Sequence, residues 1–179
     1  MTEANDVLDF WFSADPEMWF TKDPAFDEQI SDRFGSVMDA ARAGQLAHWE
    51  ASAQGLLALI IVLDQFSRNV FRNSALAFTS DDEALRLSHK LVKHPDWDAL
   101  SVHQKQFAVM PMMHAEDLGE QENCLKWMKR LELEESVRYA QIHLDIIERF
   151  GRFPHRNHVL GRRTTPEEQA FLDEGGFAG

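Results

Sequence analysis

Leu56-Leu-Ala-Leu-Ile-Ile-Val-Leu63, followed directly by Asp64-Gln-Phe-Ser-Arg-Asn-Val-Phe-Arg-Asn73, is the stretch that decides the fold. The first part is apolar nearly all round and Ser52 is placed to cap it, so the pattern predicts a helix at the centre of a core. The second part brings polar and charged side chains abruptly beside Phe66 and Phe71. We therefore expect a buried helix that gives way to a turn at this junction, with the first residues of chemical interest there.

Helical spacing and helix-end signals recur on both sides of this stretch. Before it, Val7–Phe12 is short and aromatic, and Asp23-Pro24 begins a helix that Gly44 ends. After it, helix-start patterns occur at three places, namely Ser80-Asp-Asp-Glu83, Ser101-Val-His-Gln104 and Thr165-Pro-Glu-Glu168. Two more helices are expected, one reaching about Leu131 and one over 134–150.

Pro111 interrupts one of these helical patterns, and we expect it to end or kink the helix just before Met112. No segment alternates polar and apolar residues with a period of two, so the chain is predicted to be all-α. No linker rich in proline, glycine or serine divides it, which predicts one domain over residues 1–179 with the last few residues frayed.

Composition narrows the classes of function. The 179 residues include 18 Lys and Arg against 30 Asp and Glu, a net charge of -12, which disfavours nucleic-acid and membrane partners. The longest apolar run, Leu56–Leu63, is far shorter than the roughly 20 residues of a membrane span, and the start lacks the basic region of a secretory signal. The one cysteine, Cys124, is typical of a reducing compartment, so a cytoplasmic protein is expected.

An internal similarity singles out several arginines. Leu63–Arg72 aligns without gaps on Ile147–Arg156, and both segments read aliphatic, acid, any residue, Phe, small, Arg, three residues, Arg. Tandem helical hairpins would produce such a repeat. Arginines at a helix exit can cap the last carbonyls, bind an external anion, or pair with the chain's own acids, such as Asp64, Glu116, Asp117 and Glu148.

Two further features lie in the second half of the chain. Five arginines and two histidines are concentrated within 15 residues, namely Arg149, Arg152, His155, Arg156, His158, Arg162 and Arg163. In His114-Ala-Glu-Asp117 an imidazole stands beside two carboxylates, a set that can serve as base and orienting group. Asp117 and Glu116 can equally stabilise the first turn of the next helix. The spacing matches no established metal-ligand motif, so no metal site is expected.

Three segments also resemble a known family. Leu63–Arg72, Met110-Pro-Met-Met-His-Ala-Glu-Asp117 and Arg149-Phe-Gly-Arg-Phe-Pro-His-Arg-Asn157 are similar to the signature blocks of the bacterial domain of unknown function 924. The resemblance runs from Val7 almost to the end of the chain. It implies antiparallel helical hairpins in a tetratricopeptide-repeat-like array of about seven to nine helices, and it implies no activity.

Two functional interpretations follow, and both expect the three segments to meet around one cleft. In the first, the protein binds a small anion or an acidic or C-terminal peptide through Asp64, Arg68, Asn69, Arg72, Asp117, Arg152, Arg156 and Asn157. In the second, it is an enzyme, for example a hydrolase, with His114 or His155 as general acid or base, Asp64 or Glu116 orienting the base, and arginines stabilising negative charge. Neither interpretation includes a cofactor, and the sequence leaves the oligomeric state open.

Overall fold

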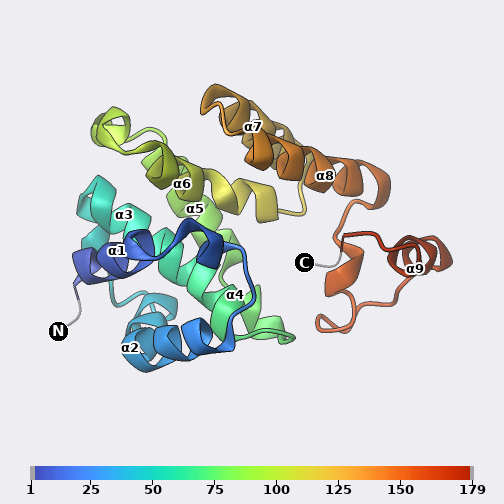
Figure 1. Cartoon of the computed structure of the whole chain (residues 1–179), viewed down its shortest axis with the longest axis horizontal. Coiled ribbons are helices and arrows are strands. Elements are labelled where there is room, and N and C mark those ends of the chain that lie inside the picture. Colours follow the sequence, from blue (N-terminus) through green and yellow to red (C-terminus); the bar gives the residue numbers. More distant parts are fainter. Residues whose placement is uncertain (1–2, 178–179) are drawn as a thin grey trace. The chain divides into compact units, whose positions relative to one another are not determined.

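A computed structural model describes residues 3–177 of the chain, and all of the regular elements in this range are helices (Figure 1). The α-helices are α1 (Ala4–Ser13), α2 (Pro24–Arg42), α3 (Ala53–Ile60), α4 (Ser67–Val70), α5 (Asp81–Leu91), α6 (Val102–His114), α7 (Leu118–Arg130), α8 (Glu134–Phe150) and α9 (Pro166–Asp173). A π-helix, η3 (Ile61–Phe66), joins α3 to α4. Short 3₁₀ turns are η1 (Pro16–Trp19), η2 (Ala47–Ala51), η4 (Ala75–Ala77), η5 (Pro95–Ala99) and η6 (Pro154–Arg156). The predicted all-α class is confirmed.

The chain forms two compact units, and we describe each by itself. The first comprises Met1–Arg72 and Leu76–Pro111, and the second comprises Asn73–Ala75 and Met112–Gly179. The boundary falls inside α6. The single domain over residues 1–179 and the tetratricopeptide-repeat-like arrangement stay predictions. Within the described residues no helix is long and apolar enough to cross a membrane.

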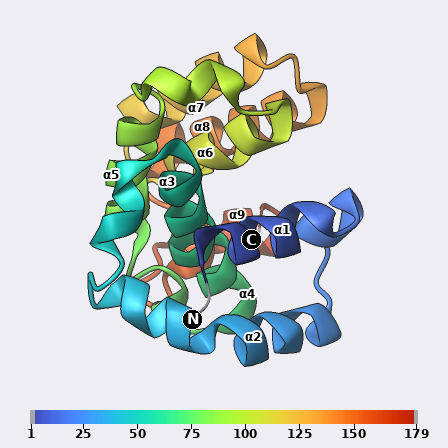
Figure 2. The same ribbon diagram turned by 90° about the vertical axis from the view of Figure 1, so that its left-hand side faces the viewer.

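The first unit is built around α3. Both α1 and α5 pack against this helix, and α2 packs against η3 (Figure 2). Leu56, Leu57 and Ile60 of α3 are buried completely. Aromatic rings fill the space next to them, with the Trp11 ring 5.8 Å from Phe66 between centroids. The predicted buried central helix is confirmed, because an element that is apolar all round needs neighbours on every side.

The central helix does not end at Asp64, where the sequence predicted a turn. The helical backbone passes through η3 and α4 and ends only at Phe71. The side chain of Ser67 donates to the carbonyl of Val62 (3.4 Å) and accepts from Arg42 Nη2 (3.2 Å), at the point where the π-helix returns to α-helix. The continuation buries Asp64 fully and leaves Gln65 only 7% exposed.

Most helix starts agree with the sequence signals. Asp23, Ser52 and Thr165 each accept a backbone N–H of the first turn that follows them. Ser80 does precede α5, but its side chain makes no capping hydrogen bond, and Glu83 binds Arg86 instead of completing a box. Two charge-assisted bonds to an arginine are stronger than one to a backbone amide, which explains the difference.

One alternative was that Pro111 ends its helix. The structure differs, since α6 continues to His114. The carbonyl groups that follow the proline find a side-chain donor. Nε2 of the buried Gln121 donates to the carbonyls of Met113 and Ala115, both at 2.7 Å. These bonds satisfy the helix end, where carbonyl groups have no partner within the helix.

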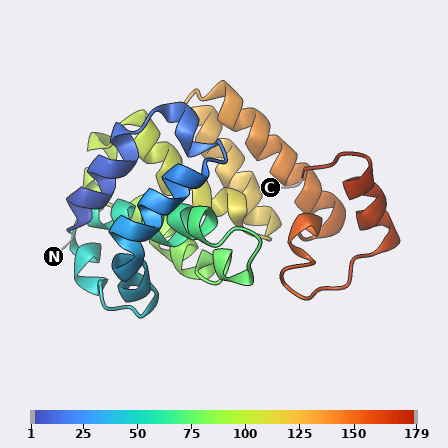
Figure 3. The same ribbon diagram turned by 60° about the horizontal axis from the view of Figure 1, so that its bottom comes forward.

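The second unit consists of α7 and α8 side by side, followed by the segment that carries α9 (Figure 3). Residues 131–133 join the first two helices, and α8 ends at Gly151, whose φ of 68° is the left-handed conformation that glycine adopts readily. Ile146, Ile147 and Phe153 form a small core. Phe150, Phe171 and Phe177 pack against it, which ties α9 and Phe177 to the end of α8.

Candidate functional site

The charged junction in the first unit is an ion-pair network. Arg68 lies between two acids, with Nη1 2.9 Å from Asp64 Oδ1 and Nη2 2.9 Å from Asp81 Oδ2. Gln65 Nε2 donates to the other oxygen of Asp64 at 2.6 Å. Burial by itself lowers the pKa of Arg68, but the two carboxylates outweigh burial and raise it. The guanidinium therefore stays charged and is committed to the protein's own acids.

Asn69 and Arg72 bind a third acid, Asp27 of α2. Arg72 grips its carboxylate with two nitrogens, Nε at 2.6 Å and Nη2 at 3.0 Å, and Asn69 Nδ2 donates to it at 2.7 Å. The sequence named Asn69 and Arg72 but missed Asp27 and Asp81. Both acids stand in the first turn of a helix, where they are common for local reasons alone.

In the second unit, Glu116 organises the segment that follows α8. Its oxygens accept from Arg162 at 2.6 and 2.9 Å and from the backbone N–H of Phe153 at 2.8 Å. Arg162 also donates to Asn157 Oδ1 (2.9 Å) and to the carbonyl of Phe153 (3.0 Å). Burial raises the pKa of Glu116, but the bonds from Arg162 and Phe153 hold it below its usual value.

Glu168 also binds an arginine in this unit, whereas the sequence predicted for it only a place in the capping box of α9. Arg152 holds it with Nε at 2.6 Å and Nη2 at 2.9 Å, and the buried Asn157 donates to it at 3.1 Å. The backbone N–H of Thr165 donates to it at 2.8 Å, which completes the predicted capping box of α9. The bonds from Arg152 lower the pKa of Glu168 to about 2, although burial acts in the opposite direction.

Three imidazoles and one guanidinium lie beside these pairs, and we call them the histidine cluster: His114, His143, His155 and Arg156. The ring centroids of His114 and His143 are 6.4 Å apart, and Phe177 packs on both His143 (4.6 Å) and His155 (5.5 Å). Arg156 stacks over Phe153 at 4.6 Å and donates to the carbonyl of His114 at 3.0 Å. The parts of the chain around residues 114, 143 and 155 therefore lie close together within the second unit.

His143 is the buried member of the histidine cluster, only 6% exposed. Its Nδ1 lies 2.8 Å from the carbonyl of Tyr139, so this nitrogen carries the hydrogen and Nε2 carries the lone pair. Burial is the largest cause that lowers the pKa of His143 to about 3, and electrostatic interactions with His114, Arg156 and His155 act in the same direction. The imidazole is therefore neutral at pH 7.

The remaining candidates have structural positions. Asp117 is the N-cap of α7 and its side chain accepts from the backbone N–H of Glu120 at 3.0 Å, as one interpretation expected. Cys124 is buried, which raises its pKa to about 12 and leaves the thiol protonated. Residues 3–177 contain no group of three His, Cys, Asp or Glu side chains arranged to hold a metal ion. The meeting of all three sequence segments around one cleft stays a prediction.

Arg162→Lys tests how much the fork geometry at Glu116 contributes. Lysine keeps the charge but loses the two parallel bonds to Glu116 and cannot also reach Asn157 and Phe153, so we expect the free energy of unfolding to fall by about 1.5 kcal/mol. Urea denaturation measures the change. Arg163→Lys, at the exposed neighbouring position, is the control. Equal effects of the two substitutions would contradict the assignment.

Comparison with known proteins identifies the class of this all-helical chain. A family model described as "Bacterial protein of unknown function (DUF924)" matches residues 7–176. The chain therefore belongs to this family, and the resemblance seen in the sequence is confirmed. No curated protein matches the chain.

A solved structure is also closely similar. It is described as a protein of unknown function, ATU0120, from Agrobacterium tumefaciens. The identity is 41%, the match covers 96% of this chain and 97% of the other, and the TM-score is 0.92.

Proposed function

We propose that this chain is a binding protein for a small anionic ligand, a carboxylate or a phosphate, held at the histidine cluster. The observation that carries the proposal is the neutral, buried His143 among His114, His155 and Arg156. Burial is the largest cause of this low pKa, and the smaller part that comes from His114, Arg156 and His155 is the part that favours a negative group at the same place. The Nδ1–H tautomer leaves His143 Nε2 to accept a hydrogen bond from a hydroxyl of the ligand.

Several of the arginines predicted to contact a ligand are instead paired with acids of the chain itself. Arg152 is committed to Glu168, and Arg162 is committed to Glu116. Arg68 and Arg72 are committed in the same way in the first unit. His114 and His155 are half-buried and lie beside His143, and on this proximity we assign the anion contacts to them, with Arg156 contributing to the field.

The enzyme alternative has less support. A general base works best when its pKa is near the operating pH, whereas the pKa of His143 is about 3. Glu116, one of the two expected orienting groups, uses its oxygens for Arg162 and the N–H of Phe153. Catalysis by His114 or His155 would need a different orienting group, while binding needs only the local field.

Titration with succinate and with inorganic phosphate tests the proposal. A chloride salt keeps the ionic strength constant during each titration. We expect saturable shifts of the ring resonances of His114 and His155 in NMR spectra and a rise in the unfolding temperature, because a ligand that binds only the native state stabilises it. His155→Gln should weaken the affinity at least fivefold. His158→Gln, at an exposed position, should leave it unchanged.

Two results would overturn the proposal. One is the lack of any saturable shift with either anion in the unsubstituted protein. The other is equal affinity of the His155→Gln and His158→Gln variants, which would place the anion away from the histidine cluster.

A further inference from the structure

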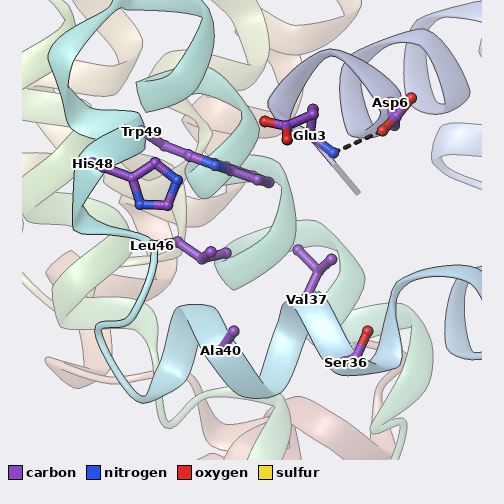
Figure 4. Close-up of a pocket in the computed structure, with 8 residues that line it drawn as sticks. All are labelled: Glu3, Asp6, Ser36, Val37, Ala40, Leu46, His48 and Trp49. Carbon is purple, nitrogen blue, oxygen red and sulfur yellow. Dashed lines mark hydrogen bonds between the residues drawn. The ribbon is translucent and has the colours of Figure 1, made fainter. Parts of the chain in front are cut away.

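A pocket of about 570 Å³ lies in the first unit, between the start of α1, the middle of α2 and η2 (Figure 4). Its volume is within the range of small-molecule sites. Val37 and Leu46 supply an apolar surface, and the indole of Trp49 forms a wall. Glu3 and Asp6 stand at the rim beside the start of α1. None of these residues belongs to the ion-pair networks or to the histidine cluster.

The wall that carries Trp49 is held rigidly in place. The backbone of Trp49 approaches Gly55 of α3 so closely that a Cβ on Gly55 would lie 1.9 Å from the Trp49 carbonyl oxygen. Next to it, Glu50 accepts from Arg86 Nη2 at 2.7 Å and from Lys90 Nζ at 2.8 Å. These contacts fix η2 against α3 and α5, so this wall of the pocket is in place before any ligand arrives.

The polar groups of the pocket define the charge of a ligand. The lining contains the carboxylates of Glu3 and Asp6 and the imidazole of His48, and it contains no lysine or arginine among the described residues. Asp6 Oδ2 accepts from the backbone N–H of Glu3 at 2.7 Å, which positions one carboxylate at the rim. With two acids and an overall charge of -12, the pocket favours a cation.

Trp49 adds an aromatic surface to the lining of the pocket. Its side chain is only 6% exposed, so the protein holds the ring in a fixed position. An indole ring offers a large apolar contact surface. The indole face also attracts an ammonium group, and the apolar surface of Val37 and Leu46 suits a hydrocarbon body.

We propose that this pocket binds a small organic amine, with the ammonium group at Glu3 and Asp6 and the hydrocarbon part against Trp49, Val37 and Leu46. The proposal concerns the first unit alone and does not depend on the anion proposed for the second unit.

The test uses 2-phenylethylamine as the probe, with 2-phenylethanol as its uncharged counterpart. The chain has five tryptophans, so the indole N–H groups give five resonances in a ¹⁵N-labelled sample, and Trp49→Phe assigns that of Trp49. We expect the amine to shift the Trp49 resonance saturably, and the alcohol to bind at least tenfold more weakly.

A double substitution, Glu3→Gln with Asp6→Asn, should weaken amine binding at least tenfold, while the amide introduced at position 6 keeps an oxygen for the backbone N–H of residue 3. The double substitution Asp9→Asn with Glu28→Gln removes the same charge from exposed positions outside the pocket and should leave the affinity unchanged. The remaining resonances report that each variant is folded. The proposal is overturned if the amine gives no saturable shift, if amine and alcohol bind equally, or if both double variants bind alike.

Discussion

Glu168→Ala is expected to lower the free energy of unfolding by about 3 kcal/mol, because it removes the shared acceptor of Arg152, Asn157 and the Thr165 N–H. The Glu168 side chain is only 3% exposed, so water cannot take its place. The buried Asn157 amide would lose one acceptor, and the loop from α8 to α9 would lose its main attachment.

Urea denaturation at pH 7 measures the loss. Glu167→Ala is the matched control, since Glu167 is exposed and stands in the same first turn of α9. Its removal should lower the free energy of unfolding by well under about 1 kcal/mol, because only its interaction with the helix dipole is lost. A similar small loss for Glu168→Ala would show that the Arg152 pair contributes little to the stability of the fold.

The second expected result is a fall in stability from about pH 6.5 downward, caused by His143. In the unfolded chain this imidazole titrates near 6.5, but in the folded protein its pKa is about 3. Between these values the unfolded state binds one more proton, so folding is weakened by about 1.4 kcal/mol for each unit of pH decrease. Above about pH 6.5 this contribution is constant and fully present.

The pH dependence can be assigned to His143 by substitution. His143→Gln should flatten the slope of the unfolding free energy between about pH 6.5 and 4.5, whereas the exposed control His158→Gln should retain it. Below about pH 4.5, Glu168 adds a further loss in both variants, because its pKa of about 2 lies below the usual 4.5. Parallel slopes in the two variants would exclude His143 as the cause.

The helix boundaries could be predicted because their signals are local. Thr165 and Glu168 cap α9 within four residues, and Asp23 caps α2 in the same way. The partners of the arginines could not be predicted, since Arg152 meets Glu168 only through the path of the loop between them. Asp64 and Glu116 were among the acids expected to pair with arginines, and both do.

His143 could have been found from the sequence. It lies three residues after Ala140 and directly before Leu144, two apolar residues of the predicted helix, and all three are buried in α8. A titratable side chain on a buried face is a candidate for a perturbed pKa. The partners His114 and His155 were selected, but their proximity to His143 depends on how the chain turns after Gly151.

Within one long helix, the π-helix η3 changes the direction about the helix axis in which the following side chains point. Because an α-helix advances about 100° per residue, one additional residue in a turn rotates everything after it by about that angle. In this rotated position Arg68 binds Asp81, and both Asn69 and Arg72 bind Asp27. Loss of one residue from Ile61–Phe66 would leave a regular α-helix of sound propensity, but it would turn all three side chains away from their acids. The length of this segment, and not only its composition, is therefore under constraint.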